Sequence, residues 1–302
     1  MVPAGHELGP GAHVQPHTTA RPTPYADPTV TQADPIHAHL RAHRSIRRYR
    51  PDPVADDVLH RILESALRAS SSGNMQSYSI VVTRDRALRE RLHAPHLEQD
   101  MVLEAPVLLT FCSDFHRMRR WLALSGAADG FDDPFAFAVG AIDAALASQN
   151  AALAAEAEGL GICYLGSTFA NADAIATILE LPQHVVPVVG FVLGHPAEEP
   201  ALRDRLPLDG LVHDETYRDP DDDAVRAIYR ARETAGWERY MGNPDLRRRI
   251  EASGVRNLAQ VYSQLKYTRA DHEVFTANVT RVLRDQGFVG RGAPIGPDSA
   301  ER

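Results

Sequence analysis

The stretch FAFAVGAIDAALASQNAALAAEAEG, residues 135–159, is apolar and rich in alanine, and it decides what kind of fold the chain can adopt. A helix of this length, at roughly 1.5 Å per residue, would cross the hydrocarbon core of a bilayer. Polar side chains interrupt the stretch at five positions: Asp143, Gln149, Asn150, Glu156 and Glu158. Because charged groups inside a membrane are costly, the stretch predicts a long helix buried in a globular protein or in a subunit interface, and no membrane association.

Strand and helix patterns alternate on both sides of this helix. Runs of β-branched and apolar residues predict four strands, at 78–83, 106–112, 161–166 and 184–194. Helical spacing of apolar residues predicts shorter helices at 53–70, 84–92 and 171–180. This alternation predicts an α/β or α+β chain. The last third has no clear strand, so we expect its helices to wrap another element, with a partner subunit as the natural candidate.

Composition places the chain among globular proteins of the cytoplasm. Of its 302 residues 44% are hydrophobic and 24% charged, and the net charge is -8. An acidic balance argues against a general nucleic-acid binder. Cys112 and Cys163 each lie in an apolar run, which predicts reduced, buried thiols rather than a disulfide framework.

The first 34 residues have a different composition from the rest. They are rich in proline, histidine, alanine and threonine and contain neither a basic start nor an apolar run. We expect residues 1–34 to form a disordered extension and not a signal peptide.

Positive charge is concentrated in the stretch HRSIRRYRPDPV, residues 43–54. Arginines at a helix end can simply favour the negative pole of the helix dipole. They can also form a socket for an anionic ligand. Both interpretations remain open on this segment alone, because all basic residues except Lys266 are arginine and arginine is therefore weak evidence by itself.

Two further segments favour the socket. The loop SSSGNMQS, residues 70–77, offers hydroxyl groups and backbone N–H groups that can cradle an anion. The segment RDRLP, residues 203–207, adds two arginines. Together with residues 43–54, these segments form three separated clusters suited to one planar ligand that carries a phosphate.

Other familiar sites are absent from the sequence. The glycines Gly159, Gly161 and Gly166 lie between a predicted helix and a strand, the reverse of the order that a dinucleotide-binding loop needs. They are better explained as a cap of the long helix and a tight turn. His39 and His43 have a spacing that would suit a metal, but no carboxylate or thiol completes the set, so no metal is expected.

The complete set of motifs resembles the nitroreductase superfamily, most closely the group of oxygen-insensitive NADPH nitroreductases and flavin reductases. The resemblance rests on the segments at 43–54, 62–82, 141–167 and 181–196 and closes with LRDRLPLDGLVHDETY, residues 202–217. It implies an α+β (α/β/α) FMN fold, in which helices flank a mainly antiparallel sheet, built as an intertwined homodimer with FMN at the subunit interface. It also implies an FMN-binding domain at 35–217 and a C-terminal helical extension, 218–302, that packs on the dimer.

The resemblance assigns cofactor-binding positions residue by residue. Carried over to this chain, they are His43, Arg44, Ser45, Arg47, Ser70, Ser71, Ser72, Gln99, Tyr164, Leu165, Gly166, Ser167, Arg203 and Arg205. The first three match the family's phosphate-binding start, and Arg47 matches the arginine directed at the ribityl chain and the pyrimidine edge. Gln99 matches a glutamine that hydrogen-bonds the isoalloxazine, whereas Arg48 and Arg50 are expected on the surface. Two positions depart from the family: Ser167 replaces a second glycine, and Arg203 replaces a lysine.

The implied activity is the transfer of two electrons from NADPH or NADH through FMN to a nitroaromatic, quinone or flavin acceptor by a ping-pong mechanism. No catalytic side chain is expected, because the cofactor carries the chemistry. Arg230, Arg232 and Arg239 are candidates for the nucleotide phosphate, although the C-terminal segment and residues 118–135 depart from the family pattern. The alternatives are a specialised biosynthetic or flavin-supplying reductase and an FMN-binding protein that does not turn over.

Overall fold

The computed structural model describes residues 33–290. The chain divides into two compact units, residues 1–41 and 42–302. In the first unit the described residues form most of helix α1 (Ala33–Ala42). The extension predicted at 1–34 therefore lies almost entirely outside the described residues. Everything below concerns the second unit.

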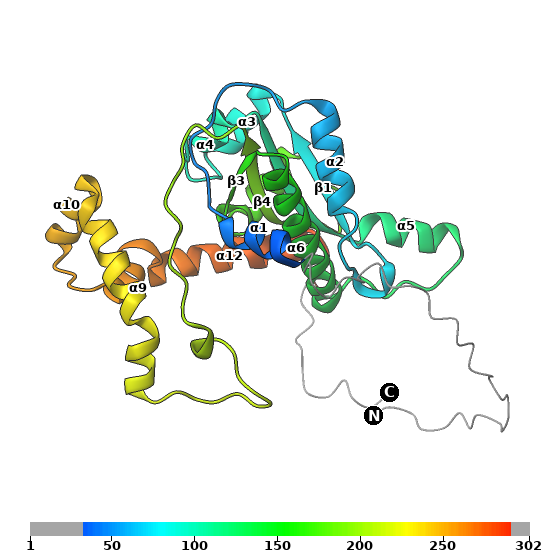
Figure 1. Cartoon of the computed structure of the whole chain (residues 1–302). Helices are drawn as coiled ribbons and strands as arrows, with labels where there is room; N and C mark the ends of the chain where they lie inside the picture. Colours follow the sequence, from blue (N-terminus) through cyan, green and yellow to red (C-terminus); the bar gives the residue numbers. More distant parts are fainter. Residues whose placement is uncertain (1–32, 291–302) are drawn as a thin grey trace, which may run out of the picture. The chain divides into compact units, whose positions relative to one another are not determined.

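The second unit is built around one antiparallel sheet, which confirms the predicted α+β class (Figure 1). Its strands are β1 (Tyr78–Thr83), β2 (Val107–Asp114), β3 (Gly161–Tyr164) and β4 (Val185–Gly194). The order across the sheet is β1-β2-β4-β3, and every neighbouring pair is antiparallel. Each predicted strand is present within a few residues of its expected ends.

Both faces of the sheet are buried, and this explains why the strands appear as continuous apolar runs. Leu109 and Phe111 of β2 pack in one hydrophobic cluster, whereas Leu108, directly before Leu109, packs in another. Successive strand side chains point to opposite faces, so a strand covered on both sides needs apolar residues at nearly every position.

Helices cover both faces of the sheet (Figure 1). On one face lie α2 (Asp56–Ala66) and α6 (Pro134–Ala157). The cluster on the other face includes residues of α3 (Arg86–His93), α4 (Met101–Glu104) and α8 (Ala172–Ile178). The remaining elements are α5 (His116–Leu124), α7 (Ser167–Ala170), α9 (Asp222–Gly242), α10 (Pro244–Ser253), α11 (Leu258–Val261), α12 (Arg269–Asp285), the short 3-10 turns Ser72–Asn74 and Leu208–Gly210, and the π-helix Tyr262–Lys266.

Helix α6 is the predicted long helix, and it lies very close to the sheet. A Cβ atom at Gly140 would approach Ser113 Oγ and stand 2.8 Å from the carbonyl oxygen of Ser77. Only glycine therefore permits the helix to approach β1 and β2 so closely. By length and hydropathy α6 is a candidate membrane span, yet 44% of its apolar window is buried against the rest of the protein.

Two smaller predictions are confirmed. Cys112 and Cys163 are free and buried, as their apolar surroundings indicate. Gly159, just after α6, has φ +75°, the left-handed conformation with which a glycine ends a helix.

The C-terminal helices do not join the sheet, in keeping with the absence of strand patterns after β4. Helix α12 packs on α7 and α8, where Arg281 pairs with Asp173 at 2.9 Å. Helices α9, α10 and α11 form a small core of their own around Ile250, Val255 and Val261. Both parts belong to the same compact unit as the sheet. The domain boundary at residue 217 stays a prediction.

Candidate functional site

The arginine-rich segment is fixed along the end of the sheet. Its backbone donates from Ile46 N to Ile162 O of β3 at 2.8 Å and from Arg50 N to His195 O at 2.9 Å. Gly161 permits the first contact, because a Cβ there would stand 2.6 Å from an Ile46 side-chain carbon. The segment therefore reaches the edge of the sheet at a defined register, with Ile46 and Tyr49 buried and Arg47, Arg48 and Arg50 exposed.

Each exposed arginine of the segment has different surroundings. Arg48 pairs with Glu104 at 2.9 Å and Arg50 pairs with Asp52 at 3.5 Å, as expected for surface residues. Arg44 lies against Glu199 and the carbonyl oxygen of Pro200. Arg47 differs from these three arginines, because its guanidinium group lies near that of another arginine, Arg203.

Arg47, Arg203 and Arg239 come together from three distant parts of the sequence. Partial burial, then the neighbouring guanidinium groups of Arg239 and Arg47, lower the pKa of Arg203 from its usual value. Burial raises the pKa of the Cys163 thiol, near the end of β3, and the positive charge of Arg47 opposes this rise. Neighbouring guanidinium groups repel one another. The Asp204 carboxylate offsets part of this repulsion, and an anionic ligand would offset more of it.

His43 is more constrained than the sequence suggests. Its Nδ1 lies 2.6 Å from Glu156 Oε1 near the end of α6. Ser45 is half-buried, as His43 is, and its hydroxyl forms a hydrogen bond with the Cys163 thiol. The predicted phosphate-binding start therefore lies between the ends of α6 and β3, and its contact with a phosphate stays a prediction.

The loop after β3 presents backbone rather than side chains. Tyr164 directs its ring onto Phe191, and Leu165 is buried. Gly166 is exposed, and a Cβ there would meet nothing within 4 Å. The loop can therefore lie against a planar ring through its backbone, as the resemblance implies.

Gln99 and Ser167, predicted separately, are brought together by the fold. Gln99 Nε2 donates to the carbonyl oxygen of His96 at 2.8 Å and lies 3.5 Å from Ser167 Oγ. His96 Nδ1 lies 3.0 Å from the same hydroxyl. Burial, with a smaller effect of His93, lowers the pKa of His96 to about 4, so this imidazole is neutral at neutral pH.

The serine loop is held by a buried carboxylate in the middle of α6. Asp143 is 0% exposed and accepts from Ser72 N at 2.9 Å and from Ser77 N at 3.2 Å. Buried carboxylates need such partners. The contact fixes both ends of the loop 72–77 and leaves Ser70 and Ser72 exposed at the surface.

The serine loop and His43 lie far apart in one chain. Ser72 is bonded to Asp143, and His43 to Glu156. These carboxylates are thirteen residues apart on α6, about 20 Å along its axis at roughly 1.5 Å per residue. One phosphate cannot contact both groups of the same chain.

Two of the three arginines predicted to hold a nucleotide are paired within the protein. Arg232 Nη1 lies 3.0 Å from Asp204 Oδ2, and Arg239 Nη1 lies 3.6 Å from Asp204 Oδ1. Partial burial raises the pKa of Asp204, but the hydrogen bond and charge of Arg232, with smaller contributions that include the charge of Arg239, together outweigh it, and the net direction is downward. A nucleotide phosphate at this position would have to compete with the Asp204 carboxylate.

The third arginine shares a cavity with Arg232 but not with Arg239. Arg230 and Arg232 both line a cavity of 520 Å³ formed by α9, α11 and the π-helix, and Arg239 does not. The structure therefore does not bring the three candidate arginines into one site. Arg239 is the one that lies beside the predicted flavin residues, and the assignment of all three to a nucleotide stays a prediction.

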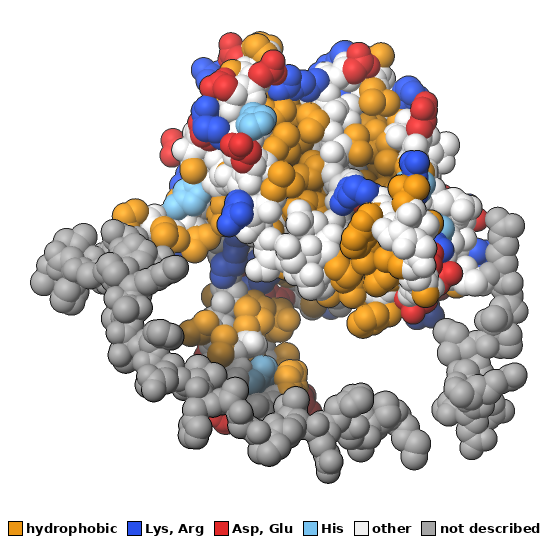
Figure 2. All heavy atoms as spheres, turned by 90° about the vertical axis from the view of Figure 1, so that its right-hand side faces the viewer, with side chains coloured by type: hydrophobic (Ala, Val, Ile, Leu, Met, Phe, Trp, Pro, Cys, Tyr) orange, Lys and Arg blue, Asp and Glu red, His pale blue; other side chains and the backbone are white. Residues whose placement is uncertain are grey.

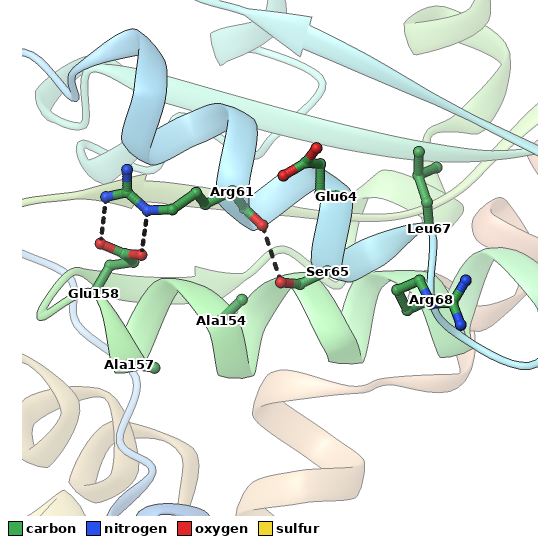
Figure 3. A pocket seen from close by; sticks show the side chains of 8 residues that line it. All are labelled: Arg61, Glu64, Ser65, Leu67, Arg68, Ala154, Ala157 and Glu158. Carbon is green, nitrogen blue, oxygen red and sulfur yellow. Dashed lines mark hydrogen bonds and ion pairs between the residues drawn. The ribbon is translucent and has the colours of Figure 1, made fainter.

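The groove between α2 and α6 is a second hollow, of 700 Å³. Figure 3 shows the Arg61 side chain reaching across it to Glu158, which accepts from Nε and Nη2 at 2.8 Å each. Leu67, Ala154 and Ala157 also line it. None of the predicted cofactor residues lines this groove.

Two residues that the sequence did not single out organise the site: Asp143 and His96. In the sequence Asp143 is an isolated carboxylate within an apolar helix. A carboxylate in such a position indicates that it has hydrogen-bond donors as partners in the core. His96 carries no comparable signal, because its bond to Ser167 spans 71 residues.

An antiparallel sheet flanked by helices, with arginines from distant segments near its edge, defines the class of protein: an α+β fold with a cationic cluster beside the sheet. The comparison with known families specifies it further. The Nitroreductase family model matches residues 40–195, more than half of the chain. The chain belongs to the nitroreductase family.

Relatives with described activities are similar over most of their length. The chain is 36% identical to an FMN reductase [NAD(P)H] of Bacillus subtilis over 190 residues, 61% of this chain and 74% of the relative. It is 38% identical to the oxygen-insensitive NADPH nitroreductase of Salmonella typhimurium over 192 residues, 63% and 77% of the two chains. The crystal structure of the NADPH:FMN oxidoreductase from Vibrio harveyi complexed with NAD+ superimposes with a TM-score of 0.66 at 26% identity, covering 84% of this chain and 99% of that one.

Proposed function

We propose that this chain is an FMN-dependent NAD(P)H oxidoreductase of the nitroreductase and flavin reductase type. Family membership supports it, as do relatives named for FMN and NADPH. The structural observation that carries it is the convergence of Arg47, Arg203 and Arg239 beside the end of β3. Such a cluster, with Asp204 as the carboxylate that faces it, suits an anionic planar ligand.

The residues present fit FMN. Arg47 and Arg203 would face the polar edge of the ring system, because guanidinium groups form paired, charge-assisted bonds. The exposed Gly166 leaves room for a ring against the loop backbone, and Gln99 adds a carboxamide. The predicted phosphate contacts are His43, Arg44 and Ser45, with Ser70, Ser71 and Ser72 of the serine loop.

When bound, FMN would supply the redox chemistry, the transfer of two electrons between a nicotinamide nucleotide and an acceptor. The protein contributes position and electric field. The arginine cluster favours negative charge on the part of the ligand that it faces. We expect a ping-pong mechanism, in which the oxidised nucleotide leaves before a nitroaromatic, quinone or flavin acceptor binds.

A homodimer is required if the serine loop and the His43 segment are to share one cofactor. The two groups lie about 20 Å apart along α6, so a serine loop from a second chain would have to complete each site. Helix α6 also exposes Ile142 at 58% and Leu146 at 43%, one helical turn apart on one face. Figure 2 shows further hydrophobic side chains gathered on the face where α2, β1 and α5 lie. We therefore propose a cytoplasmic homodimer.

Replacing Leu146 by arginine tests the dimer. We expect the wild-type chain to sediment as a dimer and Leu146→Arg to sediment as a monomer, because an unpaired charge in an apolar interface is strongly unfavourable. The monomer should lose at least tenfold in FMN affinity. Glu90→Arg is the control, since Glu90 is exposed on α3, on the opposite face of the sheet from α6 and outside the C-terminal extension. A monomeric wild-type protein with full FMN affinity would refute the shared site.

Anaerobic titration with each nucleotide tests the activity. The flavin absorption bands of the purified protein should bleach with NADPH or NADH, and the preferred donor should bleach them at lower concentration. Because Asp204 occupies Arg232 and Arg239, we expect the preference for NADPH over NADH to rise in Asp204→Asn. Flavin that stays oxidised with both nucleotides would favour the alternative of an FMN-binding protein without turnover. A colourless protein that takes up no FMN would refute the assignment.

A further inference from the structure

A polar cluster joins the turn after α3 to the start of α7, directly after the predicted ring-binding loop. It consists of His96, in the turn after α3, Gln99 three residues later, and Ser167 at the start of α7. His96 is 0% exposed and Ser167 is 5% exposed. His96 Nδ1 lies 3.0 Å from Ser167 Oγ, and Gln99 Nε2 lies 2.8 Å from the His96 carbonyl oxygen.

The cluster determines how the Gln99 carboxamide is oriented. A carbonyl oxygen can only accept a hydrogen bond, so the Gln99 atom at 2.8 Å from His96 O must be the nitrogen. The second contact of that nitrogen, at 3.5 Å, is the Ser167 hydroxyl. With the nitrogen held by the protein, the Gln99 atom offered to a ligand is the carbonyl oxygen, which suits an N–H group.

The turn that carries this cluster is held in an uncommon conformation. Leu97 and Glu98 both have positive φ, 58° and 52°, a region that residues other than glycine seldom occupy. Asn171 Nδ2 donates to the carbonyl oxygen of Pro95 at 2.7 Å, which adds a second link between the turn and the α7–α8 region. Strain of this kind persists only where the surroundings impose it, and it often marks functional positions.

A histidine at position 96 is also unfavourable if the side chain serves only to fill space in the core. Its Nε2 is buried without a partner among the described residues, and an unsatisfied buried nitrogen destabilises the folded protein. An apolar side chain of similar volume would avoid that cost. The imidazole is therefore explained by what its other nitrogen does, namely the bond to Ser167.

We propose that His96, acting through Ser167, is a positioning residue that fixes Gln99 with its carbonyl oxygen toward the flavin ring. The inference rests on the proposed function, because it assumes that FMN is the ligand beside Gln99. Ser167, where this chain departs from the family's second glycine, supplies the hydroxyl that links the two side chains.

Substitutions at the two linked residues test the proposal. We expect His96→Leu and Ser167→Ala each to weaken FMN binding about tenfold, measured by flavin fluorescence, and to shift the visible absorption bands of bound FMN. The double variant should be no worse than either single variant, because both remove one interaction. His96→Asn, which keeps a polar atom near the position of Nδ1, should restore affinity to within about threefold of wild type.

His93→Leu is the matched control. His93 belongs to the same region at the end of α3, and its Nε2 is also buried without a partner among the described residues, yet Ser167 bonds to His96 instead. This variant should bind FMN as wild type does. Unchanged affinity and spectrum in Ser167→Ala, or additive losses in the double variant, would overturn the proposal.

A flavin-free measurement separates the two possible failures. Nitrogen NMR of the His96 ring in the apoprotein should report a hydrogen-bonded Nδ1 that changes in Ser167→Ala. Wild-type protein that takes up no FMN refutes the proposed function. Wild-type protein that binds FMN while His96→Leu, folded by its thermal transition, binds it equally well refutes the role of His96.

Discussion

Replacing Asp143 by alanine is expected to lower the free energy of unfolding by about 3–5 kcal/mol, because it removes a buried charged acceptor and leaves two N–H groups without a partner. The carboxylate is fully buried and accepts from the backbone of Ser72 and Ser77. Urea unfolding monitored by circular dichroism measures the change. The serine loop should lose its fixed shape, so FMN affinity should fall even where the variant remains folded.

Two further variants interpret the result for Asp143. Asp143→Asn keeps the volume but offers only one acceptor oxygen, so we expect roughly half of the loss in stability. Gln149→Ala, on an exposed position of the same helix, should change the free energy of unfolding by less than about 0.5 kcal/mol. A loss below about 1 kcal/mol in Asp143→Ala would mean that water replaces the carboxylate and that the loop does not depend on it.

Replacing Arg47 by alanine is expected to weaken FMN binding about 30–100-fold, the loss that follows from removing charge-assisted hydrogen bonds. Arg47 lies beside Arg203 and near Cys163, where the predicted ligand is bound. Arg47→Lys should recover only part of the affinity, because an ammonium group cannot form the paired bonds of a guanidinium group. Flavin fluorescence during titration of the apoprotein gives the dissociation constant.

Arg48 provides the matched control for this experiment. It is the next residue in the chain and pairs with Glu104 on the surface, with 62% of its side chain exposed. Arg48→Ala should change FMN affinity less than about threefold, since exposed ion pairs contribute little. Equal losses in the two variants would indicate that the segment contributes only its overall charge, contrary to the site proposed above.

The ion pairs of Asp204 affect which nicotinamide nucleotide, NADPH or NADH, the protein would prefer as electron donor. Arg232 and Arg239 both contact its carboxylate, and this carboxylate lies between Arg203 and Arg205 in the sequence. The segment that is proposed to hold the flavin is thereby linked to α9. A phosphate-bearing donor must break this link or bind beside it, and that competition makes the Asp204→Asn measurement informative.

The elements of the fold were predictable because their signals are local. The strands at 78–83 and 184–194 are apolar over their whole length since both faces of the sheet are covered, and the long helix carries its own cap at Gly159. Helix α5 was not predicted, because residues 113–134 show only a weak pattern and none of the residues of this helix is fully buried. The cofactor motifs could also be matched to the family from the sequence, because each motif consists of residues that are neighbours in the chain.

The sequence by itself determined the α+β class, the family and the set of candidate flavin residues, since each depends on residues close together in the chain. Tertiary structure alone decided which of these residues meet. The bonds from Ser72 to Asp143 and from Ser167 to His96 each span 71 residues, and no local pattern encodes contacts at such separation. Tertiary structure also placed Arg47 and Arg239 near Arg203, and it placed Arg230 in the separate cavity of α9 and α11. The reason is that the packing of the chain, and not its composition, sets the distances between charges.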